Sequence, residues 1–300
     1  MNLLKRICPV CGAEDGTVFL KKAALTLMQC NVCSMVFASP VPSAYVDGSF
    51  YEDSGRPFYL SPEKLAGDFS AVRFARELAL FRSVCARGRV LDVGCSTGAF
   101  LFQLKNRFGA DYEIYGTDIS GPPLDYAEGK GIPIIRGNFL THDFQNKFDA
   151  VTFWAVLEHV EEPQTFVKRA FDVLNPGGVC IILVPNLSSL AVKILKEEYR
   201  YILPQHINYF NAETLRKMSC PPFEEMRFTT THFNPIVIAQ DWRGTREVDQ
   251  KERAGLLVKT NSLKQNPLLT PVRWVYNAVE KALGSLGLAD NCVCILRKPL

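Results

Sequence analysis

Two pairs of cysteines near the beginning of the sequence have the spacing of a metal site. Cys8 and Cys11 form one C-x2-C pair, Cys30 and Cys33 form another, and 18 residues separate the inner cysteines. Four thiolates at this spacing typically hold one tetrahedral zinc ion. A segment of about 45 residues also has too small a core to fold easily without such a cross-link. The spacing therefore predicts a closed, structural zinc module, and four unrelated buried cysteines are the alternative.

A hydrophobic strand that runs directly into a glycine turn is the second pattern with chemical meaning. The predicted strand Val90–Val93 includes a carboxylate and is followed by Gly94 and Gly98 before a helical stretch begins. Glycines at such a turn let the backbone approach a ligand closely. A dinucleotide-binding G-x-G-x-x-G turn would need glycines where Ser96 and Ala99 stand, so the pattern favours a different cofactor.

The segment Val90–Gly98 resembles the cofactor loop of class I S-adenosylmethionine-dependent methyltransferases. These enzymes have an acidic residue about 20 residues further on that binds the ribose, and Asp118 occupies that place, although a capping aspartate is the alternative. The resemblance extends over roughly residues 85–215. It implies a cofactor site built from a set of residues along the first four strands: Asp92, Gly94, Cys95, Gly98, Asp118, Ile119, Asn138, Phe139 and Trp154.

Two positions in this set depart from the family's pattern. Asn138 stands where the family usually has an aspartate that meets the adenine amino group, and its amide oxygen can still accept a hydrogen bond. Some relatives bind a divalent cation with two glutamates and a histidine after the fourth strand, but Ala155 replaces the first glutamate here. We therefore expect no catalytic metal at that segment.

Two histidines are candidates for a general base. His206 lies in the segment Leu203–Phe210, which resembles a histidine-aromatic segment that borders the acceptor pocket in many small-molecule and sugar methyltransferases. His159 follows the fourth strand and is the second choice. An imidazole with a pKa near neutrality suits proton removal from an acceptor. A packed, structural histidine is the alternative for each.

The elements that must position these residues alternate between strand and helix. Short apolar runs, each bounded by helical stretches, predict buried parallel strands at residues 90–93, 113–117, 132–135, 150–154 and 179–184. Strands at 228–232 and 292–296 are expected to pair across an insertion that contains an amphipathic helix near residues 272–283. The fold class is therefore α/β, with a doubly wound, seven-stranded, mostly parallel sheet of the Rossmann-like class I methyltransferase type.

The domain organisation follows from the same segmentation. We expect a zinc module at residues 1–45, a linker with a bridging helix at 46–88, and a methyltransferase domain at 89–300. Inserts at about 187–204 and 234–291 are expected to cover the pocket and select the acceptor.

Composition excludes several classes of protein. The net charge is +3 in 300 residues, and residues 1–60 hold five basic and five acidic side chains, so binding to nucleic acid is not favoured. The beginning of the chain lacks the apolar stretch of a secretory signal, and no apolar run approaches the ~18 residues of a membrane span. Ten cysteines without export indicate a reducing compartment, so we expect a cytoplasmic protein.

Together these features predict a methyltransferase that uses S-adenosylmethionine and carries a structural zinc ion. The expected acceptor is a small molecule or a sugar or glycan, methylated on carbon or oxygen. One alternative is an RNA methyltransferase whose zinc module holds RNA, although the Asn-Pro-Pro-aromatic signature of many base-amino methyltransferases is missing. The other alternative is a non-catalytic binding protein on a methyltransferase scaffold.

Overall fold

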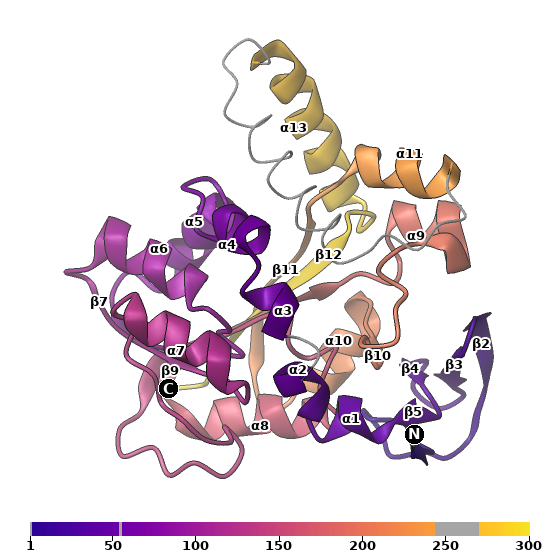
Figure 1. The fold of residues 1–300 in the computed structure, drawn as a ribbon, viewed down its shortest axis with the longest axis horizontal. Helices are drawn as coiled ribbons and strands as arrows, with labels where there is room; N and C mark the ends of the chain where they lie inside the picture. Colours follow the sequence, from indigo (N-terminus) through magenta and orange to yellow (C-terminus); the bar gives the residue numbers. More distant parts are fainter. Residues whose placement is uncertain (1, 54–55, 244–269) are drawn as a thin grey trace.

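The computed structural model describes residues 2–53, 56–243 and 270–300 (Figure 1). In these residues no helix combines the length and the apolar character that a bilayer crossing requires.

A six-stranded sheet forms the centre of the protein. Its order is β11-β12-β9-β8-β6-β7, in which β6, β7, β8 and β9 are parallel and β12 is antiparallel to both of its neighbours. The strand bounds are Gly88–Val93 for β6, Tyr112–Thr117 for β7, Phe148–Trp154 for β8, Leu174–Pro185 for β9, Glu224–Thr231 for β11 and Asn291–Arg297 for β12. The predicted pairing of the last two strands across the insertion is confirmed.

The seventh position of the expected sheet is occupied by a single bridge. Ile134 pairs in parallel with Gly116, whose N–H and C=O bond to Pro133 and Ile135. Proline cannot donate a backbone hydrogen bond, which limits the ladder at this edge. The doubly wound, mostly parallel class is as expected, and the run at 132–135 completes it as an irregular edge.

Helices cover both faces of the sheet because its buried strands present apolar side chains alternately to each side. Val90 packs with Leu101 and Leu104 of α6, whereas Leu91 packs on the opposite face with Val167 of α8. The first layer contains α5 (Ala75–Val84), α6 (Ala99–Phe108) and α7 (Gly121–Gly129), and the second contains α8 (Pro163–Val173) and α10 (Ala212–Ser219). Outside the layers lie α4 (Pro62–Asp68), α9 (Leu190–Leu195), α11 (Pro235–Arg243) and α13 (Thr270–Ser285).

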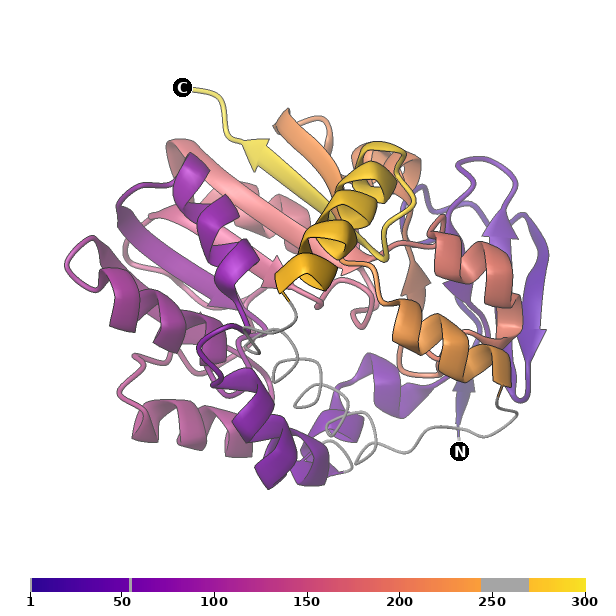
Figure 2. The ribbon, with the colours of Figure 1, turned by 90° about the horizontal axis from the view of Figure 1, so that it is seen from above.

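The N-terminal residues form a second sheet at the end of the molecule away from α5, α6 and α7 (Figures 1 and 2). Its order is β10-β4-β3-β2, and the bounds are Gly16–Lys22 for β2, Leu25–Cys30 for β3, Val36–Ala38 for β4 and Asn208–Tyr209 for β10. A separate pair joins β1 (Leu3–Leu4) to β5 (Val41–Pro42). Strand β10 is distant in sequence from the other three strands and belongs to the larger domain. The larger domain therefore supplies the edge strand of the module's sheet.

The two sheets also share apolar cores. Leu27 and Val36 of the module pack in one cluster with Leu195 and Ile207, and Met35 belongs to the main core beside β8 and β9. The division at residue 45 remains a prediction about folding units. In the structure the module is packed against the second layer and is continuous with it.

Candidate functional site

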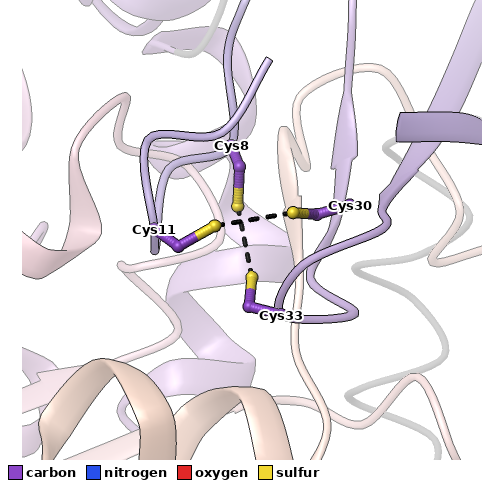
Figure 3. A group of neighbouring side chains, drawn as sticks. All are labelled: Cys8, Cys11, Cys30 and Cys33. Carbon is purple, nitrogen blue, oxygen red and sulfur yellow. Dashed lines mark hydrogen bonds between the residues drawn. The ribbon is translucent and has the colours of Figure 1, made fainter. Parts of the chain in front are cut away.

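The four cysteines of the predicted metal site point toward one another in the N-terminal module (Figure 3). The sulfur atoms of Cys8 and Cys33 lie 3.4 Å apart, those of Cys11 and Cys30 lie 3.5 Å apart, and all four lie within 4.8 Å of one another. A tetrahedral zinc site with Zn–S bonds of about 2.3 Å has sulfurs about 3.8 Å apart, so the donor set and spacing fit this ion.

Each cysteine pair sits in the same kind of tight turn. Gly12 donates to the carbonyl of Cys8, Ser34 donates to that of Cys30, and both donors have left-handed backbone with φ of 71° and 66°. Burial raises the pKa of the Cys30 thiol, but the N–H groups of Cys33 and Val32 and the neighbouring thiols outweigh this and bring the pKa to about 7. The turn at Cys30 therefore favours the thiolate that a metal needs, whereas burial raises the pKa of Cys8 and of Cys33.

A second group of residues gathers where the parallel strands end. The turns after β6, β8 and β11 each contain a residue other than glycine with left-handed backbone, namely Ser96, Ala155 and His232, with φ of 49°, 59° and 64°. Such backbone is unfavourable for side-chain-bearing residues and concentrates at functional sites. Ligands of open α/β sheets also bind beyond the carboxyl ends of the strands. This edge is therefore the candidate active site.

The glycine turn after β6 leaves no room for side chains. A Cβ atom at Gly94 would lie 2.5 Å from Val156, and Gly98 begins helix α6 with a φ of 71°. Both glycines are thus required by the backbone, which lets the turn lie directly against the segment after β8.

Asp118 lies at the end of β7, beside this turn. Its carboxylate accepts the N–H of Ser96 at 2.9 Å and that of Ser120 at 3.1 Å. Burial raises the pKa of Asp118 against the effect of these hydrogen bonds. Each carboxylate oxygen has further acceptor capacity, so Asp118 can still receive the hydroxyls of a ribose.

Asp92 lies deeper, inside β6, and is 3% exposed. The Thr152 hydroxyl on the adjacent strand donates to it at 2.7 Å. Burial raises the pKa of Asp92 to about 7, and the negative charge of Asp118 adds to the shift. Asp92 is therefore a buried acid at the base of the turn.

Cys95 and Ile119, which lie beside these aspartates, differ in burial. The Cys95 side chain is buried against Gly116, and its N–H bonds to the carbonyl of Thr117, so its contribution to the turn is packing. Ile119 is 53% exposed and packs on Gly48, which leaves an apolar surface beside Asp118.

The residues expected after the third strand have structural roles. The amide oxygen of Asn138 accepts the N–H of Leu140 at 2.9 Å and closes a turn. The Phe139 ring is 4% exposed and packs with Phe153 and Phe166, at centroid distances of 6.0 and 5.8 Å. The Phe139 ring belongs to the core on the α8 side of the sheet, and a contact of Phe139 with the cofactor stays a prediction.

Trp154 ends β8 on the opposite face. Its ring centroid lies 4.9 Å from that of Phe100, the second residue of α6, and its indole nitrogen is buried. The side chain therefore lies between the glycine turn and the helices of the first layer.

The structure brings the side chains of His159 and His206 into contact. Their rings contact edge to face with centroids 4.7 Å apart. His159 Nδ1 lies 2.9 Å from the carbonyl of Gln205 and 2.8 Å from the Tyr51 hydroxyl. Burial lowers the pKa of His159 to about 4, against the effect of the Gln205 carbonyl, so this imidazole is neutral at physiological pH.

Three residues near the histidines were not predicted as site residues: Tyr51, Tyr59 and Glu158. Glu158 is 1% exposed, and its carboxyl oxygens have no hydrogen-bond partner among the described residues. Burial raises the pKa of Glu158 to about 8. Burial also raises the pKa of the Tyr59 phenol, and the negative charges of Asp118 and then Glu158 raise it further, which places Tyr59 within electrostatic range of both carboxyls. The aromatic residues that crowd the segment from 45 to 59 were the available signal, but we interpreted that segment as a linker.

One ligand atom from each of Glu158, His159 and His206 lies within 4.8 Å of the others. A carboxylate and two imidazoles are a donor set that divalent cations accept. The expectation that no catalytic metal binds here rests on Ala155 and stays a prediction.

Sequence comparisons agree with this arrangement. A family model described as a methyltransferase domain matches residues 70–219, which is half of the chain. The ubiquinone biosynthesis O-methyltransferase of Pectobacterium carotovorum is 28% identical over 193 residues, which span 57% of this chain and 80% of the relative.

Solved structures share the fold. The N-methyltransferase NodS from Bradyrhizobium japonicum, in complex with S-adenosyl-L-homocysteine, is 14% identical, with a TM-score of 0.51 over 83% of this chain and 98% of that one. The [4+2]-cyclase SpnF is 16% identical, with a TM-score of 0.54 over 87% of this chain and 97% of that one. At these identities the likeness concerns the fold alone.

The buried acid in β6 gives a testable pH dependence of stability. Because the pKa of Asp92 rises from 3.8 to about 7 on folding, protonation stabilises the fold; this contribution is complete below pH 3.8 and is lost as the pH rises through 7. Asp92→Asn removes the charge and keeps an oxygen for Thr152. Urea unfolding should show the variant to be more stable by about 2 to 4 kcal/mol at pH 8 and nearly unchanged near pH 4. The exposed Asp143→Asn is the control, and a difference that does not vary with pH would contradict the assignment.

Proposed function

The chain belongs to the methyltransferase domain family and is an S-adenosylmethionine-dependent methyltransferase, and we propose that it methylates an oxygen or a carbon atom of a small molecule or sugar. The observation that supports this most is the convergence of Asp118, the Gly94 turn and the His159–His206 pair on one edge of the sheet.

The residues at this edge suit the cofactor. When bound, S-adenosylmethionine supplies an electrophilic methyl group on a positively charged sulfur. The turn at Gly94 packs directly on Val156, which holds its backbone against the segment after β8, and Asp118 offers a carboxylate to two hydroxyls at once. Ile119 adds an exposed apolar surface beside that carboxylate. We therefore assign cofactor binding to these positions and to Trp154 at the end of the neighbouring strand.

The hydrogen bonds of His159 favour it over His206 as the general base. A carbonyl oxygen only accepts, so the contact between His159 Nδ1 and Gln205 requires the proton on Nδ1. The lone pair is then on Nε2, which lies 4.0 Å from Glu158, too far for a hydrogen bond that would occupy it. We propose that Nε2 takes the proton from the acceptor while His206 holds the His159 ring in place.

Glu158 would assist this step through its charge. When the acceptor receives the methyl group that the bound cofactor would supply, its proton would pass to Nε2 of His159 and leave an imidazolium. Glu158 lies 4.0 Å away, and because burial raises its pKa to about 8 its negative charge would stabilise that cation only where the pH is high enough to ionise it. Tyr51 contacts the other side of the same ring through its hydroxyl and its ring edge, and so helps to hold the imidazole in place.

The nature of the acceptor is part of the proposal. The relatives that share most of their length with this chain carry O-methyltransferase names, which favours a small molecule. An RNA acceptor has less support because the first 60 residues carry balanced charge. A non-catalytic scaffold has less support because burying Glu158 without a hydrogen-bond partner costs free energy, and a scaffold would gain nothing from it.

We also propose that Cys8, Cys11, Cys30 and Cys33 hold a structural zinc ion. The four thiols leave no position for a substrate once they surround one ion, so the metal stabilises the module and takes no part in methyl transfer. All ten cysteines are free thiols in the structure, which suits a reducing compartment such as the cytoplasm.

Cofactor binding is the first test of the function. Calorimetry should detect S-adenosylhomocysteine binding to the natural protein, and Asp118→Ala should weaken it by about tenfold or more, because the ribose hydroxyls lose a charged acceptor. Asp125→Ala, an exposed carboxylate in α7, is the matched control. Equal affinity in natural and Asp118→Ala protein would show that the cofactor lies elsewhere.

The base is tested on the first acceptor found by screening phenols, sugars and other hydroxyl compounds for transfer of a labelled methyl group. His159→Gln should lower turnover by roughly 10² to 10⁴ and leave the affinity for S-adenosylhomocysteine unchanged. With a pKa of about 4, neutral His159 should keep turnover constant on the acid side down to about pH 5. If instead His206→Gln abolishes turnover and His159→Gln does not, the roles of the two histidines are reversed.

Metal analysis tests the module. Protein purified without a metal-affinity tag should contain one zinc ion per chain, and Cys8→Ser should lose it because three thiolates leave the tetrahedral site incomplete. Cys220→Ser, which changes a cysteine outside the cluster, should retain the metal. Less than about 0.3 equivalents in fresh, reduced protein would contradict the assignment.

A further inference from the structure

A cavity of about 440 Å³ lies on the first-layer face of the sheet, between α5 and α13. Its floor includes Leu183 of β9, Val293 of β12 and Thr230 of β11, and its walls include Arg76 and Glu280 from the two helices. This volume is in the range of small-molecule sites. Neither His159 nor His206 lines it, whereas Asn277, Glu280 and Lys281 of its lining belong to the insert that we expected to select the acceptor.

The cavity adjoins the expected cofactor site through one side chain. Trp154 lines the cavity and also packs on Phe100, which lies in the first turn of the helix that starts at Gly98. The next residue, Ala155, has left-handed backbone, and His232 at the cavity's rim has it too. The cavity therefore lies near the carboxyl ends of β8, β9 and β11, at the edge of the sheet that holds the other site residues.

Two residues of the lining, Trp154 and Glu280, each carry a buried polar atom that has no hydrogen-bond partner among the described residues. One is the indole N–H of Trp154, a donor, and the other is Oε2 of Glu280, an acceptor. Glu280 is 5% exposed, and its other oxygen is occupied by Arg76 and by the backbone N–H of His232. A buried polar group without a partner costs free energy, which a ligand with matching groups would recover.

The charges that line the cavity cancel. Arg76 and Lys281 are balanced by Glu77 and Glu280, and Glu77 is hydrogen-bonded to His232 at 2.9 Å. A charged ligand would find no excess of opposite charge there. A neutral ligand with hydroxyl groups would give Glu280 a donor and Trp154 an acceptor, and its carbon skeleton would contact the indole ring and Leu183.

We propose that this cavity binds a neutral, hydroxyl-bearing part of the acceptor, with Glu280 and Trp154 as the residues that recognise it. That the ligand is the methyl acceptor rests on the proposed function. Binding of a ligand in the cavity can be measured whether or not methyl transfer occurs. Glu280 and Trp154 then determine which acceptor is accepted and take no part in the chemistry.

The experiment follows the three indole N–H signals of the protein by NMR, with Trp154→Phe assigning the signal of Trp154. The probes are methyl glucoside, a neutral polyol, and catechol, an aromatic diol, each added up to about 50 mM to protein saturated with S-adenosylhomocysteine. We expect methyl glucoside to shift the Trp154 signal in a saturable way. Glu280→Gln, which keeps an oxygen for His232, should weaken this binding by about tenfold. Trp274→Phe, an exposed tryptophan on the same helix as Glu280, should bind as the natural protein does.

A Trp154 signal that stays unchanged by methyl glucoside, that shifts equally in Glu280→Gln, or that responds to catechol alone would overturn the proposal. Calorimetry on the same samples separates this from the function itself. Intact binding of S-adenosylhomocysteine with no response to the glucoside rejects only the cavity, whereas loss of S-adenosylhomocysteine binding rejects the methyltransferase assignment.

Discussion

The buried guanidinium of Arg6 joins three parts of the molecule that are distant in sequence. It donates to the carbonyls of Ala38, Ile207 and Glu161 and to the amide oxygen of Asn208. Burial lowers the pKa of Arg6 to about 10, which still leaves it charged at neutral pH. Arg6 thus satisfies several carbonyl groups at once, and together with the β10–β4 pairing and the shared apolar cores it fixes the position of the N-terminal module.

Asn208 links Arg6 to the candidate active site, because its side chain bonds both to Arg6 and to the segment after β8. Its amide nitrogen donates to the carbonyls of Leu157 and Val160, which fixes the turn between β8 and α8. The carbonyl of Glu158, in that turn, accepts the N–H groups of Ile207 and Asn208. The relative position of the two histidines is therefore set by backbone contacts with the strand that joins the N-terminal module, and the module supports the site through these contacts.

Much of the fold was predictable because its signals are local. The alternation of apolar runs identified the parallel strands, the cysteine spacing identified the module, and the strand-turn-helix segment at Gly94 identified the cofactor edge. Cavities and cross-chain pairings depend on side chains that meet only in space. Nothing in the sequence near residue 208 signals that two residues there complete a sheet formed by residues 16–38.

The same reason explains what was missed at the site. Glu158 was part of a recognised segment, but its importance comes from complete burial beside His159, which a sequence does not reveal. Phe139 and Asn138 were assigned by position after a strand, yet packing and a local turn account for them. Tyr51 belongs to a stretch without helical or strand periodicity, where only its contact with His159 identifies it.

The pairing of β10 with β4 also bears on how this protein behaves when it is shortened. A chain that starts at residue 46 would keep the whole central sheet but would lose the partner of β10 and the apolar cover of Ile207 and Tyr209, both of which are buried in the intact protein. An uncovered strand edge with apolar side chains is a template for association with other chains. The isolated methyltransferase domain would consequently be an aggregation-prone fragment, and solubility is a further reason for this chain to retain its small N-terminal sheet.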